Sequence, residues 1–68
     1  MSHMAELRKA AKLTQVAVSE ALEVDRSTVA KWETGDSTPR PDKIPEIANI
    51  YGVNIEEAFK AAYGDGKE

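Results

Sequence analysis

The sequence predicts an all-α fold, a single compact domain of five short helices. Apolar residues recur at spacings of three and four, which is typical of amphipathic helices, and no segment alternates as a strand does. Glycines and polar capping residues stand between the helical segments. Residues 5–63 are expected to form the domain, with an expression scar or disordered start at residues 1–4 and a frayed tail at residues 64–68.

The first two predicted helices follow each other closely. Leu7, Ala10 and Ala11 share one face of the segment AELRKAAK, which predicts a helix that ends near Leu13. Thr14 then stands at the N-cap position of a second helix, QVAVSEAL, because its hydroxyl can accept a hydrogen bond from the first turn.

A third helix is predicted over about residues 26–34. Asp25 is a suitable N-cap before it, and Gly35 is a natural stop after it. Val29 and Trp32 lie three residues apart, so they share one face and are predicted to anchor this helix to the core. The alternative is a Trp32 at the surface that binds a ligand, but the shared spacing favours the core. The other residues of this helix are predicted to face outward, and nearly all of them have side chains that can form hydrogen bonds.

Two further helices are predicted after the loop GDSTPRP. Asp42 is expected to cap the fourth, and Pro45 three residues later is tolerated because first-turn N–H groups have no intrahelical partner. Gly52 ends this helix, and Asn54 followed by Glu57 resembles a capping box at the start of the fifth. The fifth helix is expected to carry an apolar face of Ile55, Ala58, Phe59 and Ala62.

Composition excludes several kinds of site. The chain has no cysteine and a single histidine, His3, so neither a disulfide nor a cluster of soft metal ligands is available. It contains no run of about 18 apolar residues and no signal-peptide pattern, which predicts a cytoplasmic protein without a membrane partner. No catalytic constellation is recognisable, so we expect neither enzyme activity nor a cofactor or metal.

The net charge of −3 is unevenly distributed. Residues 1–43 contain seven basic and seven acidic side chains, whereas residues 44–68 contain two basic and five acidic ones. The first part is therefore neutral with local basic patches, and the second repels phosphate. Because local patches govern phosphate contacts, the acidic balance of the whole chain does not exclude a nucleic acid as partner.

The joint between the second and third helices indicates a motif. Leu22 closes one helix and Asp25 caps the next, and so short a turn favours the steep crossing of a helix-turn-helix. From about Leu7 to Phe59, the sequence resembles the phage repressor and Cro type of helix-turn-helix domain, also called the xenobiotic-response-element family. The matching segments are LRKAAKLTQ, QVAVSEALEVDRSTVAKWET, WETGDSTPRPDKIPEIANIYGV and NIEEAF. Glu23 stands where the family usually has glycine, which predicts a positive φ there.

This resemblance implies a sequence-specific DNA-binding transcriptional regulator with a compact five-helix, phage-repressor-like fold. It is expected to act as a repressor through the major groove of a palindromic operator, as a homodimer at least on DNA. The implied partner is double-stranded DNA, and no small-molecule ligand is expected. The alternative is an antitoxin-like or adaptor module that uses the same fold to bind protein. We expect a regulator because no toxin-wrapping segment follows the fifth helix, and a DNA-binding part of a longer regulator fits equally.

The third helix is implied to enter the major groove, where base edges call for side chains that donate and accept hydrogen bonds. Arg26 suits the O6 and N7 atoms of guanine, and Lys31 lies about one turn beyond Ser27. Gln15 and Arg40 suit phosphate, Gln15 because it opens the second helix at the positive end of its dipole. For each of these, the alternative is an ordinary solvated side chain. The candidate DNA contacts are Gln15, Arg26, Ser27, Thr28, Lys31 and Arg40.

Two further expectations concern how the helices pack. By the resemblance, Arg8 in the first helix forms an ion pair with Glu33 and ties that helix to the end of the third. The fifth helix and its surroundings are expected to provide a dimer surface with Ile50, Phe59 and Tyr63. The alternative is that these side chains complete the core of one monomer, which is favoured for Phe59.

Overall fold

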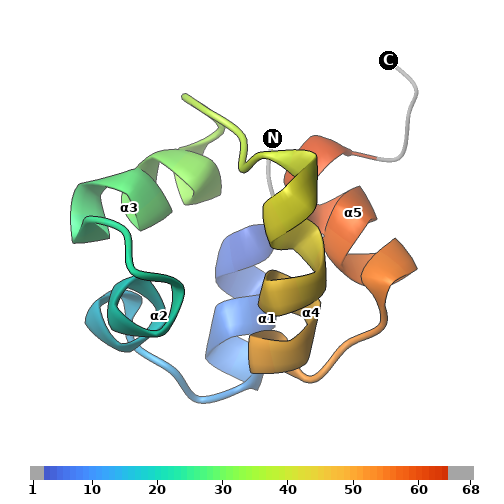
Figure 1. The fold of residues 1–68 in the computed structure, drawn as a ribbon, viewed down its shortest axis with the longest axis horizontal. Coiled ribbons are helices and arrows are strands. Elements are labelled where there is room, and N and C mark those ends of the chain that lie inside the picture. Colours follow the sequence, from blue (N-terminus) through green and yellow to red (C-terminus); the bar gives the residue numbers. More distant parts are fainter. Residues whose placement is uncertain (1–2, 65–68) are drawn as a thin grey trace.

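The computed structural model describes residues 3–64 of the chain. These residues form five α-helices and one short 3-10 helix, which turns and loops connect. The helices are α1 (Met4–Ala10), α2 (Gln15–Leu22), α3 (Arg26–Thr34), η1 (Pro41–Lys43), α4 (Ile44–Tyr51) and α5 (Ile55–Tyr63). This arrangement, shown in Figure 1, confirms the predicted all-α fold with a helix-turn-helix at α2 and α3. Parts of the predicted scar and frayed tail, residues 1–2 and 65–68, lie outside the described residues.

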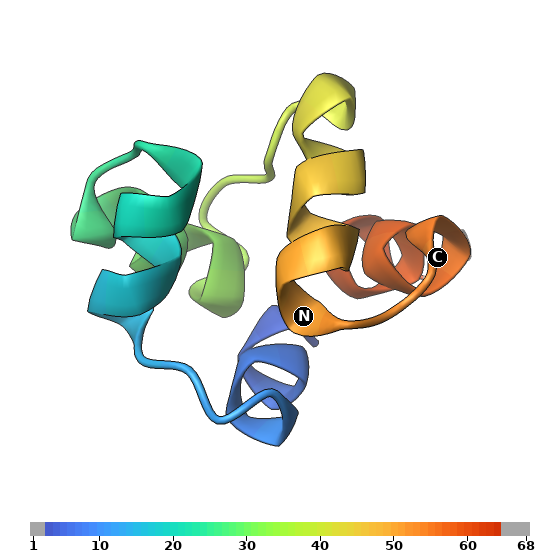
Figure 2. The same ribbon diagram turned by 60° about the horizontal axis from the view of Figure 1, so that its bottom comes forward.

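The helices form two packed pairs that α1 connects. α2 packs on α3 and α4 packs on α5, while α1 contacts α3, α4 and α5. Figure 1 and Figure 2 both show α2 and α3 on one side of the molecule and α4 and α5 on the other. Because α2 also contacts α4, the two pairs share one hydrophobic core.

Side chains from all five α-helices meet in this core. Val29 and Trp32 of α3 are both buried, and only 4% of the Trp32 surface is exposed. This confirms that they anchor α3, and a surface position for the Trp32 ring is wrong. The other buried apolar residues are Met4, Val18, Leu22, Ile44, Ile47, Ala48, Tyr51, Ala58, Ala61 and Ala62.

Side-chain hydrogen bonds begin two helices at the predicted residues. Thr14 Oγ1 accepts the N–H of Ala17 at 3.0 Å before α2, and Asn54 Oδ1 accepts the N–H of Glu57 at 2.7 Å before α5. Asp25 precedes α3 in an extended conformation, but its side chain makes no capping bond. The start of α3 is therefore where the sequence predicts it, without the predicted side-chain cap.

Glu23 adopts the left-handed conformation in the turn between α2 and α3, with φ 59° and ψ 46°. The N–H of Val24 donates to the carbonyl of Ser19 at 2.9 Å, and that of Glu23 to the carbonyl of Glu20 at 3.3 Å. These two bonds make a Schellman motif, which closes a helix with a left-handed residue. The predicted positive φ at Glu23 is confirmed, whereas a second one, at Lys12, was not predicted.

The start of the fourth helix differs from the prediction. Asp42 does not cap α4, because it lies inside η1, where the N–H of Lys43 donates to the carbonyl of Arg40 at 2.9 Å. Pro41 fixes the φ angle that starts this turn, so the chain already turns one residue before Asp42. α4 follows directly, with Pro45 in its first turn, where a missing N–H is tolerated as expected.

α1 begins earlier and ends earlier than its apolar pattern predicts. Met4 is its first residue and is only 1% exposed, although residues 1–4 are predicted to lie outside the folded domain. The N–H of His3 donates to the carbonyl of Ala61 on α5 at 3.1 Å. This contact spans nearly the whole chain, so the local pattern contains no sign of it. The helix ends at Ala10.

α5 buries two residues of its predicted apolar face, Ala58 and Ala62, and leaves the other two, Ile55 and Phe59, exposed. Ala58, Ala61 and Ala62 are buried, whereas Ile55 is 55% exposed and Phe59 48% exposed. Small side chains allow α5 to pack closely on its neighbours, and the two larger ones lie one turn apart on the outer side. The expectation that Phe59 completes the monomer core is therefore wrong.

Replacing Glu23 by glycine is expected to stabilise the protein by about 1 kcal/mol, because glycine adopts the left-handed conformation without the steric cost of a side chain. Urea unfolding followed by circular dichroism measures the free energy of unfolding. Glu20→Gly is the matched control, since Glu20 is exposed inside α2, and it should lose about 0.5–1 kcal/mol. A less stable Glu23→Gly variant would contradict the assigned turn.

Candidate nucleic-acid interface

The first turns of α3 present a polar face to solvent. Arg26, Ser27 and Lys31 are exposed, and Thr28 is half-buried. Val29 and Trp32 lie buried on the opposite side of the same helix. Because the buried pair fixes the rotation of α3 about its own axis, the polar side chains cannot turn inward.

Gln15 and Arg26 are brought together by the turn between α2 and α3. Each residue opens its helix, and Arg26 Nη1 donates to Gln15 Oε1 at 3.4 Å. Gln15 is half-buried, and its Nε2 atom donates to Glu33 Oε1 at 2.9 Å. Both ends of the Gln15 amide are therefore engaged within the protein, which the expectation of a phosphate contact did not include.

The predicted ion pair between Arg8 and Glu33 is present. Arg8 Nε lies 2.6 Å from Glu33 Oε2, and Arg8 Nη2 donates to Glu33 Oε1 at 3.3 Å. The side chains are only 14% and 8% exposed, respectively. Hydrogen bonding to Glu33 raises the pKa of Arg8 above its ordinary value. Arg8 Nη1 also donates to the carbonyl of Leu13 at 2.9 Å, so one guanidinium joins α1, α3 and the segment before α2.

Tyr51 of α4 lies close enough to this pair for both charges to act on it. It is 5% exposed, and its hydroxyl is buried without a hydrogen-bond partner among residues 3–64. Burial, and then the negative charge of Glu33, raise the pKa of Tyr51 to about 12. The hydroxyl of the folded protein is therefore protonated at neutral pH.

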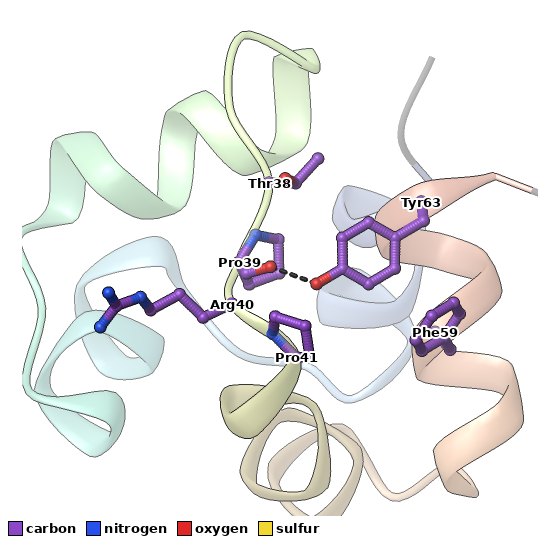
Figure 3. A pocket seen from close by; sticks show the side chains of 6 residues that line it. All are labelled: Thr38, Pro39, Arg40, Pro41, Phe59 and Tyr63. Atoms are coloured by element: carbon purple, nitrogen blue, oxygen red, sulfur yellow. Dashed lines mark hydrogen bonds between the residues drawn. The ribbon is translucent and has the colours of Figure 1, made fainter.

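Arg40 lies in the loop after α3, on the side of the loop that faces the helix-turn-helix. Its side chain is exposed, and no carboxylate among residues 3–64 pairs with it. Figure 3 shows its guanidinium pointing away from the rings of Phe59 and Tyr63, toward the part of the picture where α2 and α3 lie. A cation in this position is available to a ligand that α3 also contacts.

An open apolar groove lies on the other side of the same loop. The hydroxyl of Tyr63 donates to the carbonyl of Pro39, and the rings of Phe59 and Tyr63 are tilted, with centroids 4.6 Å apart (Figure 3). Burial, and then the charge of Asp42, raise the pKa of Tyr63. This groove was not predicted from the sequence, although the prolines on both sides of Arg40 indicate a rigid apolar loop. Its lining residues are Thr38, Pro39, Arg40, Pro41, Phe59 and Tyr63.

Of the candidate DNA contacts, Gln15 and Arg26 meet at the starts of α2 and α3, Ser27 and the half-buried Thr28 follow in the first turn of α3, and Lys31 lies exposed in its last turn. Among residues 3–64, no three histidine or carboxylate side chains are placed to hold a metal ion. In the same part of the chain, every helix is too short or too polar to span a membrane.

Comparison with known proteins supports this arrangement of helices. Residues 4–57 match the model of a family described as helix-turn-helix. The HTH-type transcriptional activator BcrR of Enterococcus faecalis is 35% identical to the chain over 52 residues. The matched segment covers 76% of this chain and 26% of that protein, so the chain spans about a quarter of the length of this relative. No solved structure matches the chain.

A double-mutant cycle of Arg8→Ala and Glu33→Ala is expected to show a coupling energy above about 1 kcal/mol. Either single substitution leaves a buried charge without its partner, so each should cost more than the intact pair contributes. The matched control is the exposed pair of Glu56 and Lys60, 3.9 Å apart on α5, where a coupling of about 0.3–0.5 kcal/mol is typical. Additive losses at Arg8 and Glu33 would contradict the assignment.

Tyr51→Phe is expected to remove a loss of stability at high pH. Below pH 10 the hydroxyl is protonated in both the folded and the unfolded chain. Between pH 10 and about 12, only the unfolded chain releases the proton, so parent stability falls as pH rises, by up to about 3 kcal/mol relative to the variant. Urea unfolding of both proteins at several pH values measures this difference. A constant difference would contradict the burial of the hydroxyl.

Proposed function

Because the chain belongs to the helix-turn-helix family of the phage repressor and Cro type, we propose that it binds double-stranded DNA sequence-specifically and regulates transcription. The observation that carries this proposal is the division of α3 into two faces. Its buried side holds Val29 and Trp32, and its exposed side presents side chains that suit base edges. A cytoplasmic location follows from this role.

In the proposed complex, the start of α3 lies in the major groove. The guanidinium of Arg26 has the fork geometry that fits the O6 and N7 atoms of guanine. Ser27 and Lys31 are exposed on the same side and reach neighbouring bases or phosphates, and the methyl group of Thr28 suits a thymine methyl. Arg40 contacts a phosphate, which its unpaired guanidinium and its direction in Figure 3 support.

The start of α2 is proposed to contact a second phosphate. Its backbone N–H groups and the positive end of its dipole suit an anion. Gln15 contributes through its backbone, because both ends of its side-chain amide are engaged by Glu33 and Arg26. Phosphate contacts at α2 and Arg40 fix the orientation of α3, and α3 supplies the base contacts.

We further propose that two copies bind a palindromic operator. One recognition helix contacts few base pairs, and a dimer places two of them about 34 Å apart, in successive major grooves. Ile55 and Phe59, both about half exposed, lie one turn apart on α5 beside the apolar groove, and a second copy would cover them. Of the predicted dimer residues, Ile50 and Tyr63 are half-buried, so Phe59 with Ile55 carries this surface.

Repression is the proposed direction of regulation, because occupying an operator is enough to block a promoter. The alternative is activation, which the name of the Enterococcus faecalis relative favours. A promoter reporter with the operator placed over or upstream of the promoter separates the two, since only an activator raises expression from the upstream position.

Selection of bound sequences from random DNA tests the proposed function. We expect a palindromic motif, two protein copies per site at saturation, and weaker binding to scrambled DNA. A selected motif without symmetry, or one protein copy bound per palindromic site, would contradict the proposed dimer but not the proposed DNA binding. The absence of any enriched motif would contradict the whole proposal and favour an adaptor or antitoxin-like module that binds protein.

Arg26→Ala is expected to change the sequence preference of DNA binding, whereas Arg40→Ala is expected to weaken binding without changing that preference. Loss of a guanine contact at Arg26 should cost about 1–3 kcal/mol and relax the preference at one base pair of each half-site. Loss of a phosphate contact at Arg40 should weaken binding to all sequences alike and reduce the salt slope by about one unit. Affinities on operator and scrambled DNA at several salt concentrations test both. An equal loss on both DNAs for Arg26→Ala would make it a phosphate contact.

A further inference from the structure

The loop between α3 and η1 is anchored at both ends by backbone hydrogen bonds. The N–H of Ser37 donates to the carbonyl of Lys31 at 3.3 Å, and the carbonyl of Arg40 accepts the N–H of Lys43 at 2.9 Å. Residues 38–39 stand between these two anchors, and they make no backbone-to-backbone hydrogen bond within the part of the chain that the structure describes. The middle of the loop therefore depends on a side chain to hold it.

That side chain is Tyr63, the last residue of α5. Its hydroxyl donates to the carbonyl of Pro39, which Figure 3 shows as a dashed line. The phenol ring is half-buried and packs against the ring of Phe59, with centroids 4.6 Å apart. Burial and the charge of Asp42 raise the pKa of the Tyr63 hydroxyl above its ordinary value of 10, so at neutral pH the hydroxyl keeps the proton that it donates.

The hydrogen bond from Tyr63 restricts the main chain of Arg40. The carbonyl of Pro39 and the N–H of Arg40 belong to one planar peptide group, so a bond to the carbonyl also fixes the start of Arg40. Pro41 restricts Arg40 from the other side, because a residue before proline is confined to an extended conformation. Arg40 has such a conformation, with φ −69° and ψ 150°. Its main chain is thus held on both sides, and its side chain keeps its rotational freedom.

Tyr63 and the guanidinium of Arg40 lie on opposite sides of the loop. In Figure 3, the Tyr63 ring approaches the loop from α5, whereas the guanidinium points toward the part of the picture where α2 and α3 lie. The hydroxyl bonds to the backbone of Pro39 and not to the guanidinium, so all five N–H donors of Arg40 remain available to a phosphate. The loop can therefore be held and bind an anion at the same time.

We propose that Tyr63 is a positioning residue for DNA binding: by holding the carbonyl of Pro39, it fixes the loop so that Arg40 meets a backbone phosphate. This role rests on the proposed function, because it presumes the phosphate contact of Arg40. A mobile loop would have to become ordered on binding, and holding it beforehand reduces that cost. α5 thereby contributes to DNA affinity although it lies outside the helix-turn-helix.

Tyr63→Phe tests the positioning role, because phenylalanine keeps the ring and removes only the hydroxyl. Affinity should fall about twofold to tenfold, on the selected operator and on scrambled DNA alike, since a phosphate contact carries no sequence information. The loss should shrink as the salt concentration rises, because phosphate contacts weaken there. Unchanged affinity, a loss confined to the operator, or a loss that does not depend on salt overturns the proposal.

Tyr51→Phe is the matched control for this substitution. It also removes one hydroxyl from a tyrosine, but this hydroxyl is buried in the core and has no hydrogen-bond partner among residues 3–64. At neutral pH, Tyr51→Phe should leave DNA affinity unchanged. An equal loss of affinity in both variants would make the effect of Tyr63→Phe a general one and overturn the positioning role.

The Arg40→Ala background separates positioning of Arg40 from an effect on the proposed dimer surface. If Tyr63 acts through Arg40, adding Tyr63→Phe to Arg40→Ala causes no further loss of affinity. If Tyr63 instead acts through contacts with a second copy beside Phe59, a further loss appears in this background, and the proposal is overturned. An Arg40→Ala variant that binds DNA as tightly as the parent also overturns it.

A measurement without DNA distinguishes failure of this proposal from failure of the proposed function. Nuclear magnetic resonance relaxation gives the order parameter of the Arg40 backbone N–H, which should be near the value of about 0.85 for rigid backbone in the parent and lower in Tyr63→Phe. Equal order parameters in the two proteins overturn the positioning role, whatever the DNA results. A parent that selects no DNA motif, although Tyr63→Phe loosens Arg40, instead overturns the proposed function.

Discussion

The ion pair between Arg8 and Glu33 is the interaction on which the arrangement of the helices depends. α1 is short, and it contacts both the helix-turn-helix pair and the pair formed by α4 and α5. Arg8 joins α1 to the last turn of α3 through Glu33 and to the segment before α2 through the carbonyl of Leu13. The side chains of Arg8 and Glu33 are nearly buried, so water competes little for the hydrogen bonds between them. The fork geometry of the guanidinium fixes the directions of these hydrogen bonds.

The small size of the domain explains why Ile55 and Phe59 remain outside the hydrophobic core. A chain of 68 residues has only enough apolar surface for one core, and α5 enters it through three alanines. Small side chains bring the helices close together, but they leave no room for Ile55 and Phe59, which stay on the outer side. The uncovered apolar surface thus results from the packing that makes α5 fit.

α3 combines two requirements in one helix. Its apolar side chains must be buried to fix the helix, and its polar ones must stay exposed and ordered to contact a ligand. The turn at Glu23 meets the first requirement by holding α3 across α2, at the cost of a strained backbone. Across the same turn, the exposed Arg26 donates a hydrogen bond to Gln15 at 3.4 Å.

The sequence by itself determined the helices, because their signals are local. Thr14 and Asn54 accept hydrogen bonds from residues three positions away, and the spacing of Val29 and Trp32 places both on one side. The family resemblance added the positive φ of Glu23 and the pairing of Arg8, which spacing alone does not contain. The tertiary structure decided what depends on segments far apart in the chain. Met4 is buried, Phe59 is exposed and the amide of Gln15 faces Glu33, because these outcomes depend on which helices meet in space.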